Sequence, residues 1–419
     1  MTTSETTPAH RSTDHVDALR ERMIERLWAV NALRSEPVAV AVRAVPRHFF
    51  VPDFPLEEVY DPQAVLRTKF DGNGEATSSI SATWIQTLML ERADLRPGMR
   101  VLEIGSGGYN AALIAEVVGP DGQVTSIDID PEVVDRARSR LAQSGYADRV
   151  EVVLGDAEHG HPAGAPYDRI IVTVAATDLP PAWTEQLIEG GRLVLPLGVR
   201  GFQRVYAFTH HGQDLLVGET GDHTGFVPMQ GLGAPAPTIV SLTDQVALTT
   251  DADPVPSPGR LPEVFAEPAY EERSGVRIGR NEYFGGLQLW LATTLPGFAT
   301  LSGDAEALGH ATIGVHQSPA VWDGTGLAYL VLPQTSTDPD QWEFLARGHG
   351  PNATELVHRL VEHVRRWDRE HRHGPGPRFL ANPALPDAPE VIRTRHTRLL
   401  PLWDQRESPQ VDWEADRDA

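Results

Sequence analysis

The sequence contains no cysteine, which excludes disulfide bonds, thiolate metal sites and a thiol nucleophile. It also has no apolar run approaching the ~20 residues that a membrane-spanning helix needs. The opening stretch MTTSETTPAHRSTDH lacks the apolar core of a signal peptide. We therefore expect a cytoplasmic protein that has no membrane partner.

Positive charge is also scarce. The chain has 36 Lys and Arg against 58 Asp and Glu, a formal net charge of -22, and this predicts no nucleic-acid partner because no basic face could neutralise phosphates. Lys69 is the only lysine. An anionic substrate would be repelled by the average field, so its site would need local positive charge, and Lys69 is a candidate for substrate binding. Chance in an arginine-rich sequence is the alternative.

The chain has 419 residues, of which 41% are hydrophobic, and this length favours two globular domains. Apolar positions follow helical spacing from Asp14 onward, whereas the preceding residues are polar and aperiodic. The pattern changes after residue 232, and a Pro- and Asp-rich stretch follows soon afterwards. The predicted division is a disordered tail at 1–13, a first domain at 14–232, a second domain at 233–403 and an acidic tail at 404–419.

Residues 99–196 alternate between short β-branched runs and helical stretches, which is typical of βαβ units around a parallel sheet. Asp130 is expected to cap one of the helices, with Pro131 at its first position. Runs at 204–209 and 214–219 predict an antiparallel hairpin that closes the sheet. The first domain is thus expected to be α/β, with a doubly wound, Rossmann-like sheet of strands Arg100–Ile104, Gln123–Ile127, Val150–Leu154, Arg169–Val174 and Arg192–Pro196.

The second domain is expected to be α+β. It combines an apolar segment at 287–295, a strand at 327–332 and a helix that starts at Asn352. Glu355 follows Asn352 by three residues, a relative of the capping box, and this predicts that the Asn352 side chain caps the helix.

A glycine-rich turn follows the first predicted strand, in the segment Glu103-Ile-Gly-Ser-Gly-Gly-Tyr109. Glycines let the backbone approach a ligand there, and the next helix points its N–H groups at the same place. A dinucleotide fingerprint would need a third glycine where Asn110 stands. Acidic residues at the next two strand ends favour S-adenosylmethionine, because Asp128 could accept both ribose hydroxyls and Asp156 the adenine amino group. The candidate cofactor residues are Glu103, Gly105, Ser106, Gly107, Tyr109, Asp128, Ile129, Asp156 and Ala157.

Residues 14–232 resemble the protein-L-isoaspartate O-methyltransferase family through several co-linear motifs. The matching pieces are Val45-Pro46-Arg47, Phe50-Val51-Pro52, Ser79-Ile80-Ser81, the glycine turn, Gly155-Asp156-Ala157, Ala165-Pro166-Tyr167-Asp168, the segment 190–196 and Phe226-Val227-Pro228. The glycine turn is one residue shorter than in the repair enzymes, and Thr83 stands where they usually have proline. These departures and the long C-terminal extension resemble the methyltransferases of FxLD-type lanthipeptide systems.

The resemblance implies roles for the loop that carries Ser79, Ile80 and Ser81. Ser81 is expected to lie nearest the reacting carboxylate and to orient one of its oxygens, and Ser79 is the second candidate catalytic residue. Ile80 and Val227 are expected to contact the substrate. A loop serine that only bonds its own backbone is the alternative for Ser81.

Methyl transfer to a carboxylate needs no general base, because an aspartyl group with a pKa of ~3.9 is already ionised at neutral pH. The expected product is S-adenosylhomocysteine plus a methyl ester, which closes to a succinimide that water opens to isoaspartate or aspartate. Three hypotheses remain open. The first is methylation of an aspartate in a modified precursor peptide (a lanthipeptide), with residues 233–403 recognising the substrate. The second is general isoaspartate repair, and the third is non-catalytic binding of a precursor peptide.

The histidine pairs lack ligand partners at metal spacing, so no metal site is expected.

Overall fold

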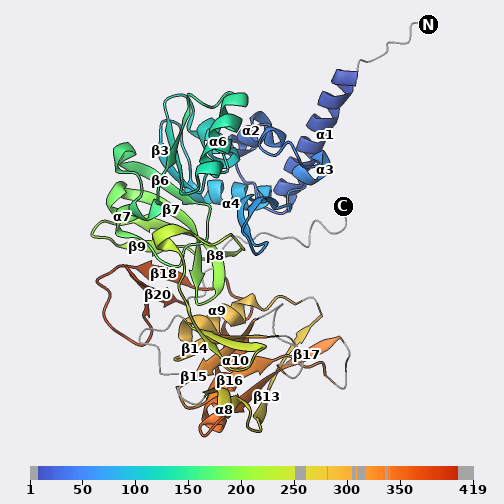
Figure 1. Cartoon of the computed structure of the whole chain (residues 1–419), viewed down its shortest axis with the longest axis vertical. Helices are drawn as coiled ribbons and strands as arrows, with labels where there is room; N and C mark the ends of the chain where they lie inside the picture. Colours follow the sequence, from blue (N-terminus) through green and yellow to red (C-terminus); the bar gives the residue numbers. More distant parts are fainter. Residues whose placement is uncertain are drawn as a thin grey trace, which may run out of the picture. The chain divides into compact units, whose positions relative to one another are not determined.

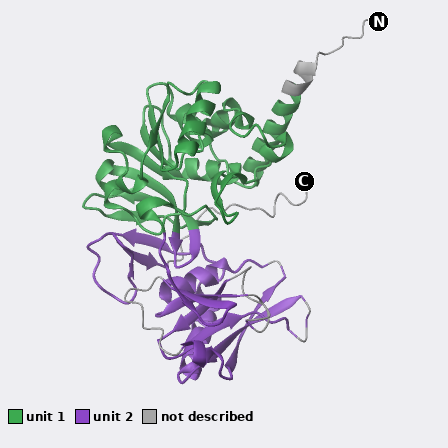
Figure 2. Ribbon diagram, viewed as in Figure 1, with its two compact units in different colours: residues 1–197, 204–234, 409–419 green, residues 198–203, 235–408 purple. Residues whose placement is uncertain are grey.

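The computed structural model describes residues 8–250, 261–280, 282–303, 308, 317–335, 338 and 340–403, with side chains from residue 14 onward. These residues form two compact units (Figure 2). The first unit comprises residues 8–197 and 204–234, and the second comprises 198–203 and 235–403. The acidic tail predicted at 404–419 and the Pro- and Asp-rich stretch after residue 250 lie outside the described residues. In the described part of the chain, no helix combines the length and apolarity that crossing a membrane requires.

The first unit opens with helices (Figure 1). Helix α1 (Pro8–Ala29) begins six residues before the predicted start at Asp14, so residues 8–13 are helical and not part of a disordered tail. Its apolar stripe is buried as helical spacing predicts, at Val16, Leu19, Met23, Leu27 and Val30. The following short elements are α2 (Glu36–Ala44), η1 (Arg47–Phe49) and α3 (Leu56–Val59).

The central sheet of the first unit has the strand order β9-β8-β7-β6-β3-β4-β5. Strands β7, β6, β3, β4 and β5 run parallel, and β8 pairs antiparallel with β9 and β10. This confirms the predicted Rossmann-like fold with its closing antiparallel strands. The strands are β3 (Arg100–Ile104), β4 (Gln123–Asp128), β5 (Val150–Leu154), β6 (Tyr167–Val172), β7 (Leu187–Val199), β8 (Phe202–His210), β9 (Leu216–Gly218) and β10 (Asp222–His223).

Helices α4 (Thr83–Ala93), α5 (Tyr109–Val118), α6 (Pro131–Gln143) and α7 (Pro181–Gln186) complete the first unit. Helix α6 forms as its sequence predicts, because the Asp130 side chain accepts a hydrogen bond from the Glu132 N–H and Pro131 occupies the first turn. Its buried positions are Val133, Val134, Ala137 and Leu141.

A separate two-stranded hairpin precedes α4. Strands β1 (Leu66–Phe70) and β2 (Ala76–Ile80) are antiparallel and, among the described strands, pair only with each other. The position of this hairpin therefore depends on its side-chain contacts.

The second unit is built on a seven-stranded sheet of order β11-β12-β14-β15-β16-β17-β13, in which every pair is antiparallel. Its strands are β11 (Thr238–Ser241), β12 (Val246–Thr250), β13 (Tyr270–Gly279), β14 (Phe298–Gly303), β15 (Gln317–Trp322), β16 (Leu327–Val331) and β17 (Gln341–His349). Strand β20 (Arg398–Leu402) pairs antiparallel with β18 (Arg378–Ala381) and with β19 (Ile392–Arg393). The helices are α8 (Leu261–Phe265), α9 (Gly285–Thr294) and α10 (Ala353–Glu370).

Helix α10 starts where the sequence predicts, but without the predicted cap. The Asn352 side chain makes no capping bond, and its amide donates instead to Asp323 Oδ2 (2.9 Å) and Thr325 Oγ1 (3.2 Å). The helix is held by its apolar stripe, which packs into a core with α9 and the sheet. The second unit thus has hydrophobic cores of its own.

Candidate cofactor and acceptor site

The glycine turn after β3 is tightly packed on both sides. Gly105 has φ +93°, and a Cβ there would lie 2.5 Å from Thr173 Oγ1. A Cβ at Gly107 would lie 2.7 Å from Ile80 Cδ1, a side chain of the β1–β2 hairpin. Only glycine satisfies these positions without displacing neighbours, so the turn brings bare backbone to the carboxyl edge of the sheet.

Asp128 ends β4 beside this turn. Its Oδ2 accepts a hydrogen bond from the Ser106 N–H (2.8 Å), and its Oδ1 accepts one from the Asp130 N–H (2.9 Å). These bonds fix the carboxylate, and each oxygen keeps a lone pair for another donor. Burial raises the pKa of Asp128. The residue is therefore an oriented acceptor at the strand end, as a ribose-binding role requires.

The side chains of Glu103 and Ser106, two predicted cofactor residues, point beneath the turn. Glu103 is fully buried, and its carboxylate accepts hydrogen bonds from Asn110 Nδ2 (2.9 Å) and from the Ser126 hydroxyl. The Ser106 hydroxyl lies 2.9 Å from that of Ser126. Burial raises the pKa of Glu103 to about 7. These groups support the turn from inside, because their positions on the buried strand and turn point them into the protein.

Tyr109 is likewise buried, with no exposed side-chain surface. Its ring packs against Phe50, with ring centroids 5.6 Å apart, and the Arg47 guanidinium carbon lies 4.8 Å from the ring centroid. Any contact of Tyr109 with a cofactor would therefore involve its backbone. The Phe50 ring also lies close to Gly108, so it helps to form the wall behind the turn.

Asp156 follows β5 and caps the short helix η2 (Ala157–His159). Its Oδ1 accepts from the Glu158 N–H (3.0 Å), and its Oδ2 accepts from the Leu232 N–H (2.9 Å). Leu232 belongs to η4 (Gly231–Gly233), the last turn of the first unit. Sequence reasoning missed this segment, because nothing in its composition indicates a partner 76 residues earlier.

Two further predicted cofactor residues lie beside Asp156. Ile129 is 37% exposed, and its Cδ1 would lie 2.5 Å from a Cβ at Gly231. Ala157 is buried, and its carbonyl accepts a hydrogen bond from Trp183 Nε1 (2.8 Å). Because β4 and β5 are adjacent and parallel, Asp128 and Asp156 come to the same edge of the sheet.

The Ser79–Ser81 segment reaches the glycine turn through Ile80, which is buried against Gly107. The structure shows no hydrogen bond from the Ser79 or Ser81 hydroxyl to another described residue. The Ser81 carbonyl, by contrast, accepts a hydrogen bond from Arg47 Nη2 (2.9 Å). The structure thus fixes the backbone at Ser81 and leaves its hydroxyl available to an acceptor.

Arg47 is a residue whose part sequence reasoning missed, although its motif was recognised. It is fully buried, its Nε donates to the Val59 carbonyl (2.9 Å), and its Nη1 donates to Gln86 Oε1 (2.9 Å). Burial lowers the pKa of Arg47. A single buried guanidinium therefore ties the Ser81 backbone to η1, α3 and α4.

Lys69, predicted to bind the substrate, is paired with two acidic side chains in the structure. Its Nζ lies 2.6 Å from Asp130 Oδ2 and 2.8 Å from Glu132 Oε2. These hydrogen bonds raise the pKa of Lys69 and pair its charge within the protein. Val227 lies at the same sheet edge, where its carbonyl accepts a hydrogen bond from the Ala175 N–H (2.8 Å).

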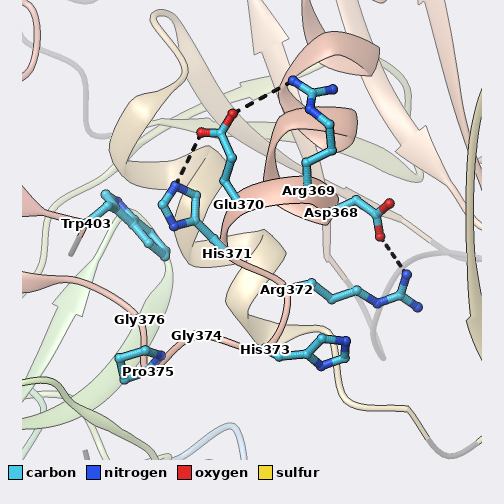
Figure 3. Close-up of a pocket in the computed structure, with 10 residues that line it drawn as sticks. All are labelled: Asp368, Arg369, Glu370, His371, Arg372, His373, Gly374, Pro375, Gly376 and Trp403. Atoms are coloured by element: carbon cyan, nitrogen blue, oxygen red, sulfur yellow. Dashed lines mark hydrogen bonds and ion pairs between the residues drawn. The ribbon is translucent and has the colours of Figure 1, made fainter. Parts of the chain in front are cut away.

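Across the described ranges, no group of three His, Cys, Asp or Glu side chains is placed to hold a metal ion. The second unit contains a pocket of about 330 Å³ at the C-terminal end of α10 (Figure 3). It is lined by residues 368–376 and by Trp403. His371 packs between aromatic side chains there, 4.5 Å from the Trp290 ring and 5.1 Å from the Trp403 ring.

The glycine turn and the acidic strand ends define a Rossmann-like methyltransferase. Residues 18–233 match the family model described as Protein-L-isoaspartate(D-aspartate) O-methyltransferase, and the chain belongs to this family. It is a carboxyl O-methyltransferase of the kind that uses S-adenosylmethionine. The turn at Gly105 and Gly107 and the oriented Asp128 fit this methyl donor.

Proteins named protein-L-isoaspartate O-methyltransferase are similar to about half of the chain. The protein-L-isoaspartate O-methyltransferase of Hyperthermus butylicus is 41% identical over 220 residues, which are 51% of this chain and 88% of that protein. The Methanopyrus kandleri enzyme is 44% identical over 188 residues, 45% of this chain and 80% of that one. A solved structure titled protein-L-isoaspartate O-methyltransferase is 22% identical with a TM-score of 0.49, and the similarity covers 86% of this chain and 96% of that one.

Proposed function

We propose that the first unit binds S-adenosylmethionine with Asp128 on the ribose and Asp156 on the adenine, and that Ser81 orients the acceptor carboxylate. The observation that carries this proposal is the packing of Ile80 against Gly107, which joins the serine segment to the cofactor turn. The cofactor supplies an electrophilic methyl group, and the acceptor is already ionised because its pKa is ~3.9. The protein must then align the acceptor oxygen with the methyl group and the sulfur. Such alignment can lower the activation free energy by roughly 7–11 kcal/mol.

Within this proposal, Arg47 positions Ser81 without touching the substrate. Its bond to the Ser81 carbonyl fixes the backbone, so that the hydroxyl needs only one torsion to donate to a carboxylate oxygen. The Leu232 N–H donates to one oxygen of Asp156, and the carboxylate keeps lone pairs that can accept from the adenine amino group. Ile80 and Val227 form apolar and backbone surfaces beside the acceptor, and Ser79 lies on the same segment.

For the substrate, we propose an aspartate side chain in a ribosomally made, thioether-cyclised peptide. Methylation of that carboxylate forms an ester, the following backbone nitrogen displaces methanol to close a succinimide, and water opens the ring to isoaspartate or aspartate. The second unit supports this choice, because the family model ends at residue 233 while residues 235–403 build further sheets and cores. A folded peptide offers contacts over a surface, and remote binding energy can orient the reacting group.

The pocket beside α10 gives the second unit a recess of side-chain size. The charges along its wall are largely paired, as in the pair of Arg372 Nη1 and Asp368 Oδ1 (2.6 Å). Trp403 and His371 supply the aromatic part of the lining. We propose that this pocket takes an apolar or aromatic side chain of the peptide, because burying such a group costs less than burying another charge.

General protein repair is the second candidate function. The relatives favour it, because those that match the first unit carry the name protein-L-isoaspartate O-methyltransferase. In this alternative the acceptor is isoaspartate, and the same succinimide chemistry returns it to aspartate. The second unit would then serve stability or assembly.

One experiment separates the two functions. The full chain is assayed with S-adenosylmethionine on a cyclised aspartyl peptide, on its linear form and on a short isoaspartyl peptide. The tailoring function predicts a lanthipeptide precursor and its synthetase among the neighbouring genes, and such a precursor would provide the peptide for the assay. A clear preference for the cyclised peptide supports tailoring, whereas best activity on the short isoaspartyl peptide establishes repair.

A variant in the second unit sharpens this assay. Trp403→Ala opens the pocket and should raise KM for the cyclised peptide while leaving the short isoaspartyl peptide unaffected. A shortened chain is a poorer test, because residues 198–203 belong to the second unit and Phe202 packs 6.1 Å from the Phe298 ring there. Removing the second unit would leave that ring without its packing partner.

A further inference from the structure

The β1–β2 hairpin, which leads into Ser81, is attached to helix α6 by two basic side chains. Lys69 on β1 binds Asp130 and Glu132 at the start of α6. Arg136 Nη2, one turn further along α6, donates to Thr68 Oγ1 on β1 and to Ser78 Oγ on β2, both at 3.1 Å. Both strands of the hairpin are therefore bound to one helix.

The pair of Lys69 and Asp130 is the more sheltered of the two ion pairs, because the Glu132 side chain is 74% exposed. The Lys69 side chain is 28% exposed and that of Asp130 is 15% exposed, so solvent screens this pair less than it screens a pair on the open surface. The hairpin has no described strand partner outside itself, so these bonds help to hold it in place beside the core packing of Leu66 and Ile80. A charge-assisted bond of 2.6 Å is among the stronger ones available.

Asp130 connects the hairpin to the candidate ribose carboxylate. Its Oδ2 binds Lys69, its Oδ1 accepts from the Glu132 N–H, and its own N–H donates to Asp128 Oδ1 at 2.9 Å. The other oxygen of Asp128 accepts from the N–H of Ser106 in the glycine turn. A continuous set of hydrogen bonds thus runs from the glycine turn to the hairpin.

We propose that Lys69 and Arg136 are positioning residues that couple cofactor binding to the placement of the Ser79–Ser81 segment. The proposal rests on the roles proposed above for Asp128 and Ser81. A cofactor that binds Asp128 restricts the motion of the loop after β4. The bond between Asp130 and Lys69 extends this restriction to β1. The paired lysine thus acts within the protein, and the acceptor carboxylate never needs to touch it.

Lys69→Met in the full chain tests the coupling, because methionine keeps the aliphatic length and removes the charge. The value of kcat/KM for the short isoaspartyl peptide should fall about tenfold, since a small displacement of a positioning group is costly. Lys69→Arg should restore most of it. Arg67→Met is the matched control, because Arg67 lies on the same strand and forms no ion pair with the other residues that the structure describes. It should leave kcat/KM unchanged.

Hydrogen exchange of residues 66–80, with and without S-adenosylhomocysteine, gives a readout that needs no turnover. In the parent, the ligand should slow exchange of the hairpin amides at least threefold, and Lys69→Met should abolish this effect while still binding the ligand. Equal protection in both proteins, or kcat/KM within twofold of the parent, overturns the proposal. So does loss of ligand binding in Lys69→Met, which would make the lysine part of the cofactor site.

The two readouts keep this proposal distinct from the proposed function. If the parent methylates no aspartyl or isoaspartyl peptide, the proposed function fails, and the exchange data still decide whether the hairpin responds to the cofactor product. Salt provides a further check on the mechanism. Raising the ionic strength should lower the parent's kcat/KM and have a smaller effect on Lys69→Met, because screening acts on the pair that the variant lacks.

Discussion

The two units bring the side chains of their candidate sites together in different ways. In the first, parallel strands end at one edge, and the turn after β3, Asp128 after β4 and Asp156 after β5 meet there. In the second, antiparallel strands and long loops present side chains from many places, and the pocket at the end of α10 draws on a single helix end and on Trp403. The comparison teaches that a candidate cofactor site can be found from strand ends, whereas a pocket like that of the second unit cannot.

The units also differ in what the family accounts for. The family model covers residues 18–233 and ends where the first unit ends. The second unit nevertheless has fully buried side chains of its own, among them Leu360 and Val364 of α10. We propose that this second unit confers selectivity for a substrate.

The largest expected effect comes from the core of the second unit. Leu360→Ala removes a fully buried side chain and should lower that unit's free energy of unfolding by about 2–5 kcal/mol. Calorimetry should show an earlier transition, while S-adenosylhomocysteine binding stays unchanged and any preference for a cyclised peptide is lost. Leu113→Ala, in the core of the first unit, is the matched control and should weaken cofactor binding instead. If both variants behaved alike, the proposed division of labour would fail.

The next effect tests the cofactor edge of the first unit. Asp128→Ala removes the proposed bonds to the ribose hydroxyls, each worth about 1.5–3 kcal/mol as a charge-assisted bond. The Kd for S-adenosylhomocysteine, measured by calorimetry, should rise by at least tenfold. Asp128→Asn keeps one acceptor oxygen and should lose less. An unchanged Kd in the alanine variant would remove Asp128 from the site.

Ser81→Ala should change catalysis without changing cofactor affinity. The hydroxyl makes no bond that the fold needs, so the melting temperature and the Kd for S-adenosylhomocysteine should match those of the parent. We expect kcat to fall about a hundredfold, the cost of a poorly aligned acceptor. Ser79→Ala serves as the comparison and should lose less, because Ser81 is the serine next to the Arg47 anchor. Parent-like turnover in Ser81→Ala would make Ser81 a bystander.

Much of the first unit could be predicted from the sequence because its signals are local. The N-cap at Asp130 and the buried stripe of α6 depend on residues a few positions apart, and both formed as expected. The strands followed from β-branched runs, and their alternation with helical stretches indicated a doubly wound sheet. The fold class was predictable for this reason.

The side-chain environments were less predictable, because they depend on partners far along the chain. Lys69 pairs with Asp130, 61 residues later, and Arg47 reaches Ser81 across 34 residues. Tyr109 stands next to the glycine turn in sequence, yet the start of α5 turns its ring into the core. At Asn352 the capping pattern was present, but Asp323 and Thr325 bind its amide. Sequence proximity indicated the candidate site and did not give the direction of each side chain.

The smallest expected effect concerns Glu103, whose carboxyl lies buried beneath the glycine turn of the first unit. Burial raises its pKa to about 7 in the folded protein, whereas an exposed glutamate titrates near ~4.3. A raised carboxyl pKa means that the folded state holds the proton more tightly than the unfolded state. The contribution to stability is therefore present below the unfolded pKa and is lost as pH rises through about 7.

Glu103→Gln removes this titration while keeping an oxygen that can accept from Asn110. Between pH 6 and pH 8, the parent should lose about 1 kcal/mol of unfolding free energy that the variant retains. Any cost of the lost hydrogen bond from Ser126 appears equally at both pH values, so only the difference between them is diagnostic. Urea unfolding at the two pH values measures it, and Leu360→Ala, altered in the other unit, should follow the parent's pH dependence. Parallel profiles for Glu103→Gln and the parent would show that the carboxyl is already ionised beneath the turn, held by Ser126 and Asn110 rather than by a proton.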